Sequence, residues 1–278
     1  MAVSNEFKQS RELFVNLTQR ELRGKYKRTV LGQLWSLANP LALMLVYTFV
    51  FAFIFRIAPP RGNPSGLDVF PLWLLCGLLP WIFFSTVVSQ GMGALIANEA
   101  LIKKVYFPRS VLIYSAAASI AVNWAIEMLV LVVALMIAGA YGVLLWLPVV
   151  VVFMFLLALF AVGIALMLSI ANVHFRDTQY FVGIIIQLGM YLTPVIYPIL
   201  LVKDLSDRAG PLLGSVTLLD VYRLNPMERF LSAFRSLLYD NTWPTLADSA
   251  ACVLSAVVVF VLGWYVFRRN ERKLAEIL

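Results

Sequence analysis

One carboxylate, Glu127, stands deep inside a long apolar run of this 278-residue chain, where a charged side chain is costly and usually functional. Proton or ion transfer at such a depth would need a second acid, a histidine or a lysine at a comparable position. The sequence offers none, and Asp248 stands only at the lip of the last apolar run. We therefore expect the Glu127 side chain to form a hydrogen bond between helices or at a subunit contact.

The remaining reactive residues form no catalytic or metal-binding pattern. The chain has one histidine, His174, and two cysteines within apolar runs, which indicates neither a metal site nor a disulfide framework. A GxxxxGK[ST] phosphate loop is missing, because Gln19 stands where its first glycine would be. Clustered acids and a nucleophile elbow are also absent from the sequence. We predict a chain that is not an enzyme, binds no metal and carries no cofactor of its own.

Many of the cations lie ahead of the first apolar run. In the segment 21–40 an apolar residue recurs every four positions, on what would be one helical face: Leu22, Tyr26, Val30 and Leu34. A basic amphipathic helix of this kind is typical of a segment in the lipid headgroup layer. Five cations lie on its other side (Arg20, Lys25 and Arg28) or at the border of the apolar face (Arg23 and Lys27). They could bind a pyrophosphate headgroup, although membrane anchoring explains them equally well.

The composition is that of a membrane protein. Hydrophobic residues make up 62% of the chain, charged residues 13%, and the mean hydropathy is +0.86, which excludes an ordinary soluble domain. Six apolar runs reach the roughly 20 residues that cross a bilayer, at 35–55, 69–90, 111–138, 144–170, 180–197 and 247–267. We predict an all-α fold with one transmembrane domain over 1–278, in which a cytoplasmic interfacial helix (1–34) precedes spans one to five (35–197). An outer-face segment (198–246), span six (247–267) and a tail (268–278) follow.

The distribution of basic residues predicts the orientation of the chain. Fifteen lysines and arginines flank the six runs on one side, and seven flank them on the other. Cytoplasmic loops carry the excess of positive charge. Both termini are therefore expected on the cytoplasmic side of the membrane.

Two short segments on that side carry further candidate residues. The segment 91–109 is compatible with a short helix that ends before Pro108, and its apolar side chains could lie on lipid or dock on a protein partner. In the segment 172–180, Arg176 and Asp177 are adjacent and so would not face each other on a helix. Each is expected to pair with another element, and His174 is interpreted as a tight-loop residue.

The fifth apolar run ends in a sequence that an unbroken helix cannot contain. Pro194 and Pro198 are four residues apart, so the backbone must break near the outer leaflet. Further on, Asn225 is a candidate N-cap, followed by Pro226 at the first helical position and a glutamate at the third. The helix that follows should be amphipathic and lie on, or dip into, the outer face, with Arg229 and Arg235 near headgroups or a polar exit.

Five segments in order resemble the permease subunit of polysaccharide ABC exporters. They are KYKRTVLGQLWSLANPLALMLVYTFVFAFIF (25–55), ALIKKVYFPRSVL (100–112), FRD (175–177), TPVIYP (193–198) and LNPMERF (224–230). This is the family of O-antigen, capsule and teichoic-acid exporters (Wzm, KpsM and TagG type), which also includes the mycobacterial galactan exporter. The resemblance extends from about residue 10 to residue 270.

The resemblance implies a type-2 ABC exporter fold: a homodimer with an interfacial N-terminal helix, six spans and re-entrant helices before the last span. It also implies two copies of a separate ATPase, which bind ATP and Mg. The cargo of such exporters is a polysaccharide on a polyprenyl-pyrophosphate lipid, moved to the outer side of the plasma membrane. The segment that docks on the ATPase would then hold Glu99, Lys103, Lys104, Tyr106 and Arg109.

A passage for a sugar polymer needs aromatic faces on which rings can stack. The spans supply Tyr47, Trp81, Phe84, Tyr191 and Tyr197, although aromatics in spans more often pack or anchor. Gating or structural roles are expected for Glu127, Arg176, Asp177, Pro194, Pro198 and Arg229. Two alternatives remain open: an ABC permease for a drug or lipid, and a membrane enzyme acting on polyprenyl-linked substrates.

Overall fold

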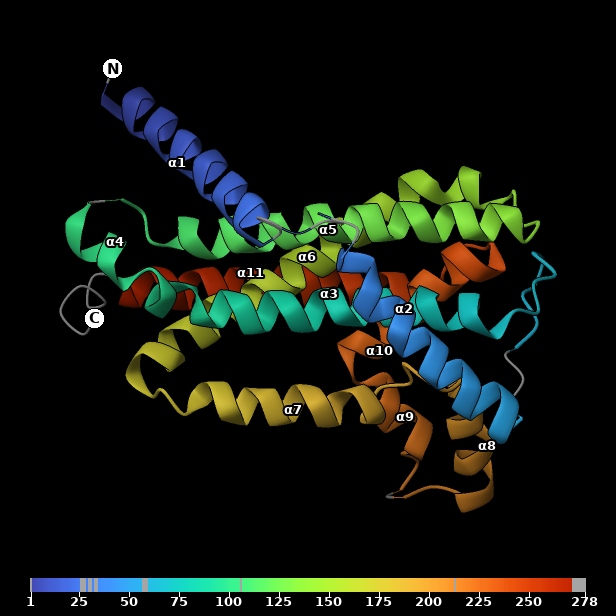
Figure 1. Cartoon of the computed structure of the whole chain (residues 1–278). Coiled ribbons are helices and arrows are strands. Elements are labelled where there is room, and N and C mark those ends of the chain that lie inside the picture. The colour runs from blue at the N-terminus through green and yellow to red at the C-terminus, as the bar shows by residue number, and fades with distance from the viewer. Residues whose placement is uncertain are drawn as a thin grey trace.

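The computed structural model describes residues 2–25, 29, 32, 35–56, 60–105, 107–212 and 214–271, with side chains from residue 11 onward except Lys25. These residues form helices and no strand (Figure 1), as the composition predicts. The helices are α1 (Ala2–Lys25), α2 (Trp35–Tyr47), η2 (Thr48–Ile54), α3 (Phe70–Ala97), α4 (Glu99–Lys104), α5 (Ser110–Ile137), α6 (Val143–His174), α7 (Thr178–Leu192), α8 (Ile199–Ala209), α9 (Leu218–Arg223), α10 (Pro226–Arg235), η3 (Ser236–Asp240) and α11 (Leu246–Asn270).

Five of the helical segments are long and apolar enough to cross a membrane: α2 with η2, α3, α5, α6 and α11. The fifth sequence-predicted span is α7, which has 15 residues. At 1.5 Å per residue it is about 22 Å long, short of the roughly 30 Å hydrocarbon core. A count of six full spans is therefore not confirmed. The helix α7 ends at Leu192 because the chain turns before Pro194.

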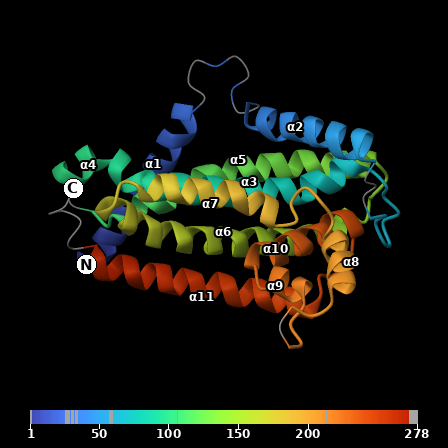
Figure 2. The same cartoon turned by 90° about the horizontal axis from the view of Figure 1, so that it is seen from below.

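The bundle is built around α3, which is the most buried of the five candidate spans. Helices α5 and α6 pack alongside it, and α11 packs on α6 (Figures 1 and 2). Helices α6 and α11 approach closely where Gly163 meets Gly263: a Cβ on Gly263 would lie 2.1 Å from the carbonyl oxygen of Gly163. Small residues at a crossing let two membrane helices pack backbone to backbone.

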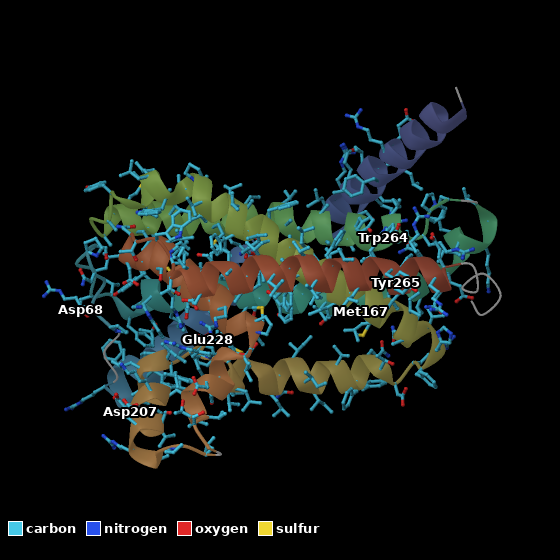
Figure 3. All side chains as sticks on the ribbon, turned by 180° about the vertical axis from the view of Figure 1, so that it is seen from behind. Asp68, Met167, Asp207, Glu228, Trp264 and Tyr265 are labelled. Atoms are coloured by element: carbon cyan, nitrogen blue, oxygen red, sulfur yellow. The ribbon has the colours of Figure 1, made fainter. Side chains whose placement is uncertain are left out.

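The two ends of the bundle differ. Helix α4, the α6–α7 turn and the last turn of α11 lie at one end, here named the α4 end (Figures 1 and 2). Helices α8 and α9 and the loop after η2 lie at the other, the α8 end. Asp68 and Asp207 mark the α8 end in Figure 3, with Trp264 and Tyr265 toward the α4 end.

The N-terminal helix differs from the one that the sequence predicts. Helix α1 ends at Lys25 and Thr29 is not helical, so the helix that contains Leu22 does not continue through Thr29. Tyr26, Val30 and Leu34 lie outside the described residues. The face that α1 buries lies further upstream: Leu17 is buried, and Leu13 and Phe14 pack against the core beside α5. Glycine is a poor helix former. Gly24 stands one residue before the end of α1, and its presence favours an end to the helix at this point.

A second correction concerns Arg235, which was predicted near headgroups or a polar exit. Its side chain is buried, with its guanidinium 3.8 Å over the ring of Trp73. Of the two predicted placements of α10, on the outer face or dipping into it, burial on most sides of the helix excludes the first. The apolar stripe of α10 packs on α3 and α11, and this contact carries Arg235 inward with it.

Candidate functional site

Helix α4 presents charged and apolar side chains at the α4 end. Lys103 Nζ lies 2.5 Å from Glu99 Oε1, a pair one helical turn apart. The hydrogen bond and charge of Lys103, together with the charge of Arg176, lower the pKa of Glu99. Lys104 is exposed, and Val105 is 52% exposed. The end of α4 and the residue after it therefore expose two cations and one apolar side chain to solvent.

Two other elements hold the α4 segment in place. Arg20 of α1 donates to Asn98 Oδ1 at 2.7 Å, just before α4 begins. After α4, the backbone N–H of Arg109 donates to Glu271 Oε1 at 2.8 Å, and its guanidinium donates to the backbone carbonyl of Glu271. Helix α4 also joins α3 to α5 along the chain. A displacement of α4 would therefore be passed to α1, α3, α5 and α11.

The α6–α7 turn brings the FRD residues to the same end. The charge of Arg176 contributes to lowering the pKa of Glu99 on α4, but Arg176 forms no ion pair among the described residues, so its pairing with another element stays a prediction. Asp177 occupies the N-cap position of α7, but its side chain forms no hydrogen bond or ion pair within the described part of the chain. His174 is the last residue of α6, and its Nδ1 lies 2.9 Å from the carbonyl oxygen of Ile170.

Near the α8 end, α10 ties the break after α7 to α11. Asn225 caps α10 by accepting a hydrogen bond from the backbone N–H of Met227 at 3.0 Å, as predicted, and its amide donates to Thr193 Oγ1 at 2.8 Å. Arg229 Nη1 lies 2.5 Å from Asp248 Oδ1, at the first turn of α11. These bonds join three elements that are distant in sequence.

Sequence reasoning missed the part played by Glu228 and Arg235 in this region. Glu228 is buried (Figure 3), and it accepts a hydrogen bond from Ser232 Oγ at 2.8 Å; burial raises its pKa. Arg235 donates to the carbonyl oxygens of Pro194 and Val195 at 2.7 and 2.6 Å. Two prolines four residues apart leave carbonyls without a helical donor, and that signal could have indicated a buried cation.

The comparison with known proteins decides the family. The family model described as "ABC-2 type transporter" matches residues 12–206. The chain belongs to the ABC-2 type transporter family. It is similar to the O-antigen export system permease protein RfbA of Myxococcus xanthus, at 31% identity over 98% of this chain and 97% of that protein. RfbA of Klebsiella pneumoniae is 27% identical over 96% and 95%, and the polysialic acid transport protein KpsM of Escherichia coli is 25% identical over 65% and 67%.

Within this ABC-2 chain, the five predicted sugar-stacking aromatics fall into two groups, Trp81 with Phe84 and Tyr47 with Tyr191 and Tyr197. Trp81 is buried, with Phe84 at a ring-centroid distance of 5.8 Å. Tyr197 donates to the carbonyl oxygen of Tyr191 at 2.8 Å, and Tyr47 lies 3.9 Å from the sulfur of Met190. Trp81 and Phe84 thus pack within the single chain, while Tyr191 is exposed. A pore-lining role for the five stays a prediction.

Of the predicted headgroup cations, the structure describes the side chains of Arg20 and Arg23. Arg20 and Arg23 are exposed, and Arg20 is engaged by Glu21 and Asn98. Lys27, Arg28 and the predicted coupling residue Tyr106 lie outside the described residues, as does the side chain of Lys25. Glu127 is buried and lines the crevice between α2 and the α3–α5 pair.

Proposed function

We propose that this chain is the permease subunit of an ABC exporter that carries a polysaccharide on a polyprenyl-pyrophosphate lipid from the cytoplasmic to the outer side of the plasma membrane. The observation that carries the proposal is likeness over nearly the whole chain to permease proteins whose names specify O-antigen export. In such a subunit the candidate spans would form the transmembrane domain, and the α4 segment would contact the ATPase.

The energy would come from a separate ATPase that docks on the α4 end. Lys103, Lys104 and Val105 form an exposed surface on which a protein partner could seat. Closure of two ATPase subunits on ATP would push α4, and the bonds of Arg20 and Arg109 would pass the movement to α1 and α11. ATP and Mg are held by the partner, and this chain supplies the passage.

A second copy of the chain would complete the passage. Only 6% of the residues in the most apolar stretch of α2 and η2 are buried within one copy of the chain. Leu45, Phe49 and Phe53 of this segment are exposed. A homodimer would cover part of this apolar surface, and lipid would cover the rest. In this proposal both termini lie on the cytoplasmic side, the side on which the excess of basic residues is expected.

Purification of the tagged chain from its own host in mild detergent tests this proposal. We expect mass spectrometry to find a nucleotide-binding subunit at one copy per permease and a complex mass of two permeases and two ATPases. The chain recovered alone, from a preparation that keeps other membrane complexes intact, would contradict the proposal. If the exporter carries a drug or another lipid, the permease–ATPase complex would be recovered with that compound bound and without lipid-linked sugar.

A further inference from the structure

One side of α11 is apolar and exposed along most of its length. Its residues recur at helical spacing and so share one face of the helix. Gly263 marks the opposite side, where α11 packs on α6. The side chains of this face, here named the α11 face, are between 44% and 66% exposed and are Leu254, Val258, Val261, Leu262 and Tyr265. In a membrane, lipid or protein must cover such a surface.

Two arginines follow the α11 face in the last turn of the helix. The guanidinium carbon of Arg268 lies 5.6 Å from the ring centroid of Trp264, within the range of a cation–π interaction. Nη1 of Arg269 donates to the hydroxyl oxygen of Tyr265 at 3.4 Å. All four side chains are exposed. Each guanidinium is thus held beside an aromatic residue one turn earlier, and its other N–H donors can reach an anion.

The length of α11 places this turn at the membrane surface. Its 25 residues extend over about 37 Å at 1.5 Å per residue, which exceeds the roughly 30 Å hydrocarbon core. Figure 3 shows Trp264 and Tyr265 toward the α4 end, and these residue types are enriched at the level of the lipid headgroups. The guanidiniums of Arg268 and Arg269 therefore lie at the depth of phospholipid phosphates.

The charge at this end of α11 is positive. Arg268 and Arg269 form no ion pair within the described part of the chain, and the carboxylate of Glu271 accepts from the backbone N–H of Arg109 at 2.8 Å. Counted over the whole sequence 268–278, cations outnumber acids, with Arg268, Arg269, Arg272 and Lys273 against Glu271 and Glu276. An excess of positive charge favours an anionic partner.

A second copy of the chain fits the α11 face poorly. In a two-fold dimer the same patch is used on both copies, and an axis along the membrane normal keeps each residue at one depth. Two packed α11 faces would then bring Arg268 and Arg269 to the level of the same arginines in the other copy, where like charges repel. An anionic lipid places a phosphate there instead, with an acyl chain along the aliphatic side chains.

We propose that the α11 face binds an anionic phospholipid of the surrounding bilayer, such as phosphatidylglycerol. The guanidiniums of Arg268 and Arg269 donate to its phosphate, because their planar N–H groups match phosphate oxygens in pairs. One acyl chain lies along Val261, Val258 and Leu254. This lipid is a resident of the membrane and not a transported cargo, and the inference does not rest on the proposed export function.

Photo-labelling in vesicles tests this site. The full-length chain is reconstituted in phosphatidylcholine with a phosphatidylglycerol probe that carries a diazirine in one acyl chain, or with a phosphatidylcholine probe that carries the same chains. After irradiation, labelled peptides are identified by mass spectrometry. We expect the phosphatidylglycerol probe to label residues 254–265 several-fold more than the phosphatidylcholine probe does. This ratio of the two probes, measured for each variant, does not depend on the yield of protein.

Variants separate a bound phosphate from general attraction to positive charge. Arg268→Gln/Arg269→Gln should lower the ratio by roughly tenfold, the effect expected for two cations near a membrane surface. Arg268→Lys/Arg269→Lys keeps both charges and loses the planar fork, so it should recover only part of the ratio. The matched control is Arg61→Gln/Arg208→Gln, which removes the same charge from exposed positions near the α8 end and should leave the ratio unchanged.

Several results would overturn the proposal. Equal labelling by the two probes, or an equal loss in the glutamine variant and its control, would show that no site exists on α11. An undiminished ratio in the lysine variant would assign the effect to charge alone. Displacement of the probe by polyprenyl pyrophosphate and not by unlabelled phosphatidylglycerol would make the lipid a cargo. Efficient disulfide cross-linking between two Val258→Cys chains would show that a second copy covers the face.

Discussion

The guanidinium of Arg235 donates to the carbonyl oxygen of Pro194 at 2.7 Å. In a continuous helix that oxygen would accept from the residue four positions later, which is Pro198 and has no N–H. A buried arginine from α10 thus replaces the missing backbone donor at the break after α7. Gly77 of α3 makes room for it, because a Cβ there would lie 2.7 Å from Nη2 of Arg235.

Replacement of Arg235 should destabilise the protein. Arg235→Met leaves the carbonyls of Pro194 and Val195 without a donor, at about 1–3 kcal/mol for each orphaned group. Arg235→Lys should recover only part of this loss, since one ammonium lacks the planar fork that serves both oxygens. Thermal unfolding in detergent measures the effect. Arg208→Lys, on the exposed surface of α8, is the control, and an Arg235→Met protein as stable as this control would contradict the account.

The crossing of α6 and α11 should tolerate no side chain at Gly263. In Gly263→Ala the new Cβ meets the backbone of Gly163, which cannot move aside as a flexible side chain would. We expect a loss of about 1–3 kcal/mol of stability. Gly183→Ala on α7 is the matched control, because no described residue outside its own helical turn would lie within 4 Å of the added Cβ. Equal unfolding temperatures for the two variants would show that α6 and α11 do not cross as described.

Charge reversal on α4 should separate ATP hydrolysis from export. The double variant Lys103→Glu/Lys104→Glu places like charge beside Glu99 and removes both cations from the proposed docking surface. Repulsion at a contact weakens binding by several kcal/mol, so we expect at least a roughly tenfold loss of export with normal membrane insertion. Surface polysaccharide and the amount of copurified ATPase are measured. Lys203→Glu on α8 is the control, and undiminished export in the double variant would refute docking at α4.

The bond between Arg109 and Glu271 should carry movement from α4 to α11. Arg109→Ala removes the guanidinium contact and keeps the backbone hydrogen bond to Glu271 Oε1. We expect the ATPase to bind and hydrolyse ATP, with several-fold less export per ATP. Arg61→Ala, exposed near the α8 end, should leave this ratio unchanged. A normal ratio in Arg109→Ala would assign the transfer to α1, α3 and α5 alone.

Hydropathy and local chemistry predicted much of this fold. Runs of apolar residues located the spans because each must satisfy its backbone within a helix, and the order Asn225-Pro226 located the start of α10. Pro194 and Pro198 predicted the break after α7. These features depend on neighbouring residues alone.

Features that depend on contacts between distant segments were not predicted. The burial of Arg235 requires Trp73 and the carbonyls after Pro194, which lie far away in sequence. The close approach of Gly163 and Gly263 has no local pattern. The end of α1 at Lys25 differs from the prediction because the four-residue apolar repeat runs past Gly24 and Gly32, and glycine is a poor helix former. In the proposed homodimer, a pore-lining role for the aromatics would depend on a second copy of the chain, which a single sequence does not place.

The most direct test of the central claim uses inverted membrane vesicles, whose cytoplasmic face is outward, containing this chain and its ATPase. Lipid-linked polysaccharide is added to the outer surface, and its exposure to an added glycosidase is followed with and without ATP. The account predicts that ATP makes the polymer resistant to digestion, and that vesicles with the Lys103→Glu/Lys104→Glu chain leave it sensitive. Polymer that stays sensitive with the intact complex and ATP, or becomes protected in vesicles without this chain, would contradict the account.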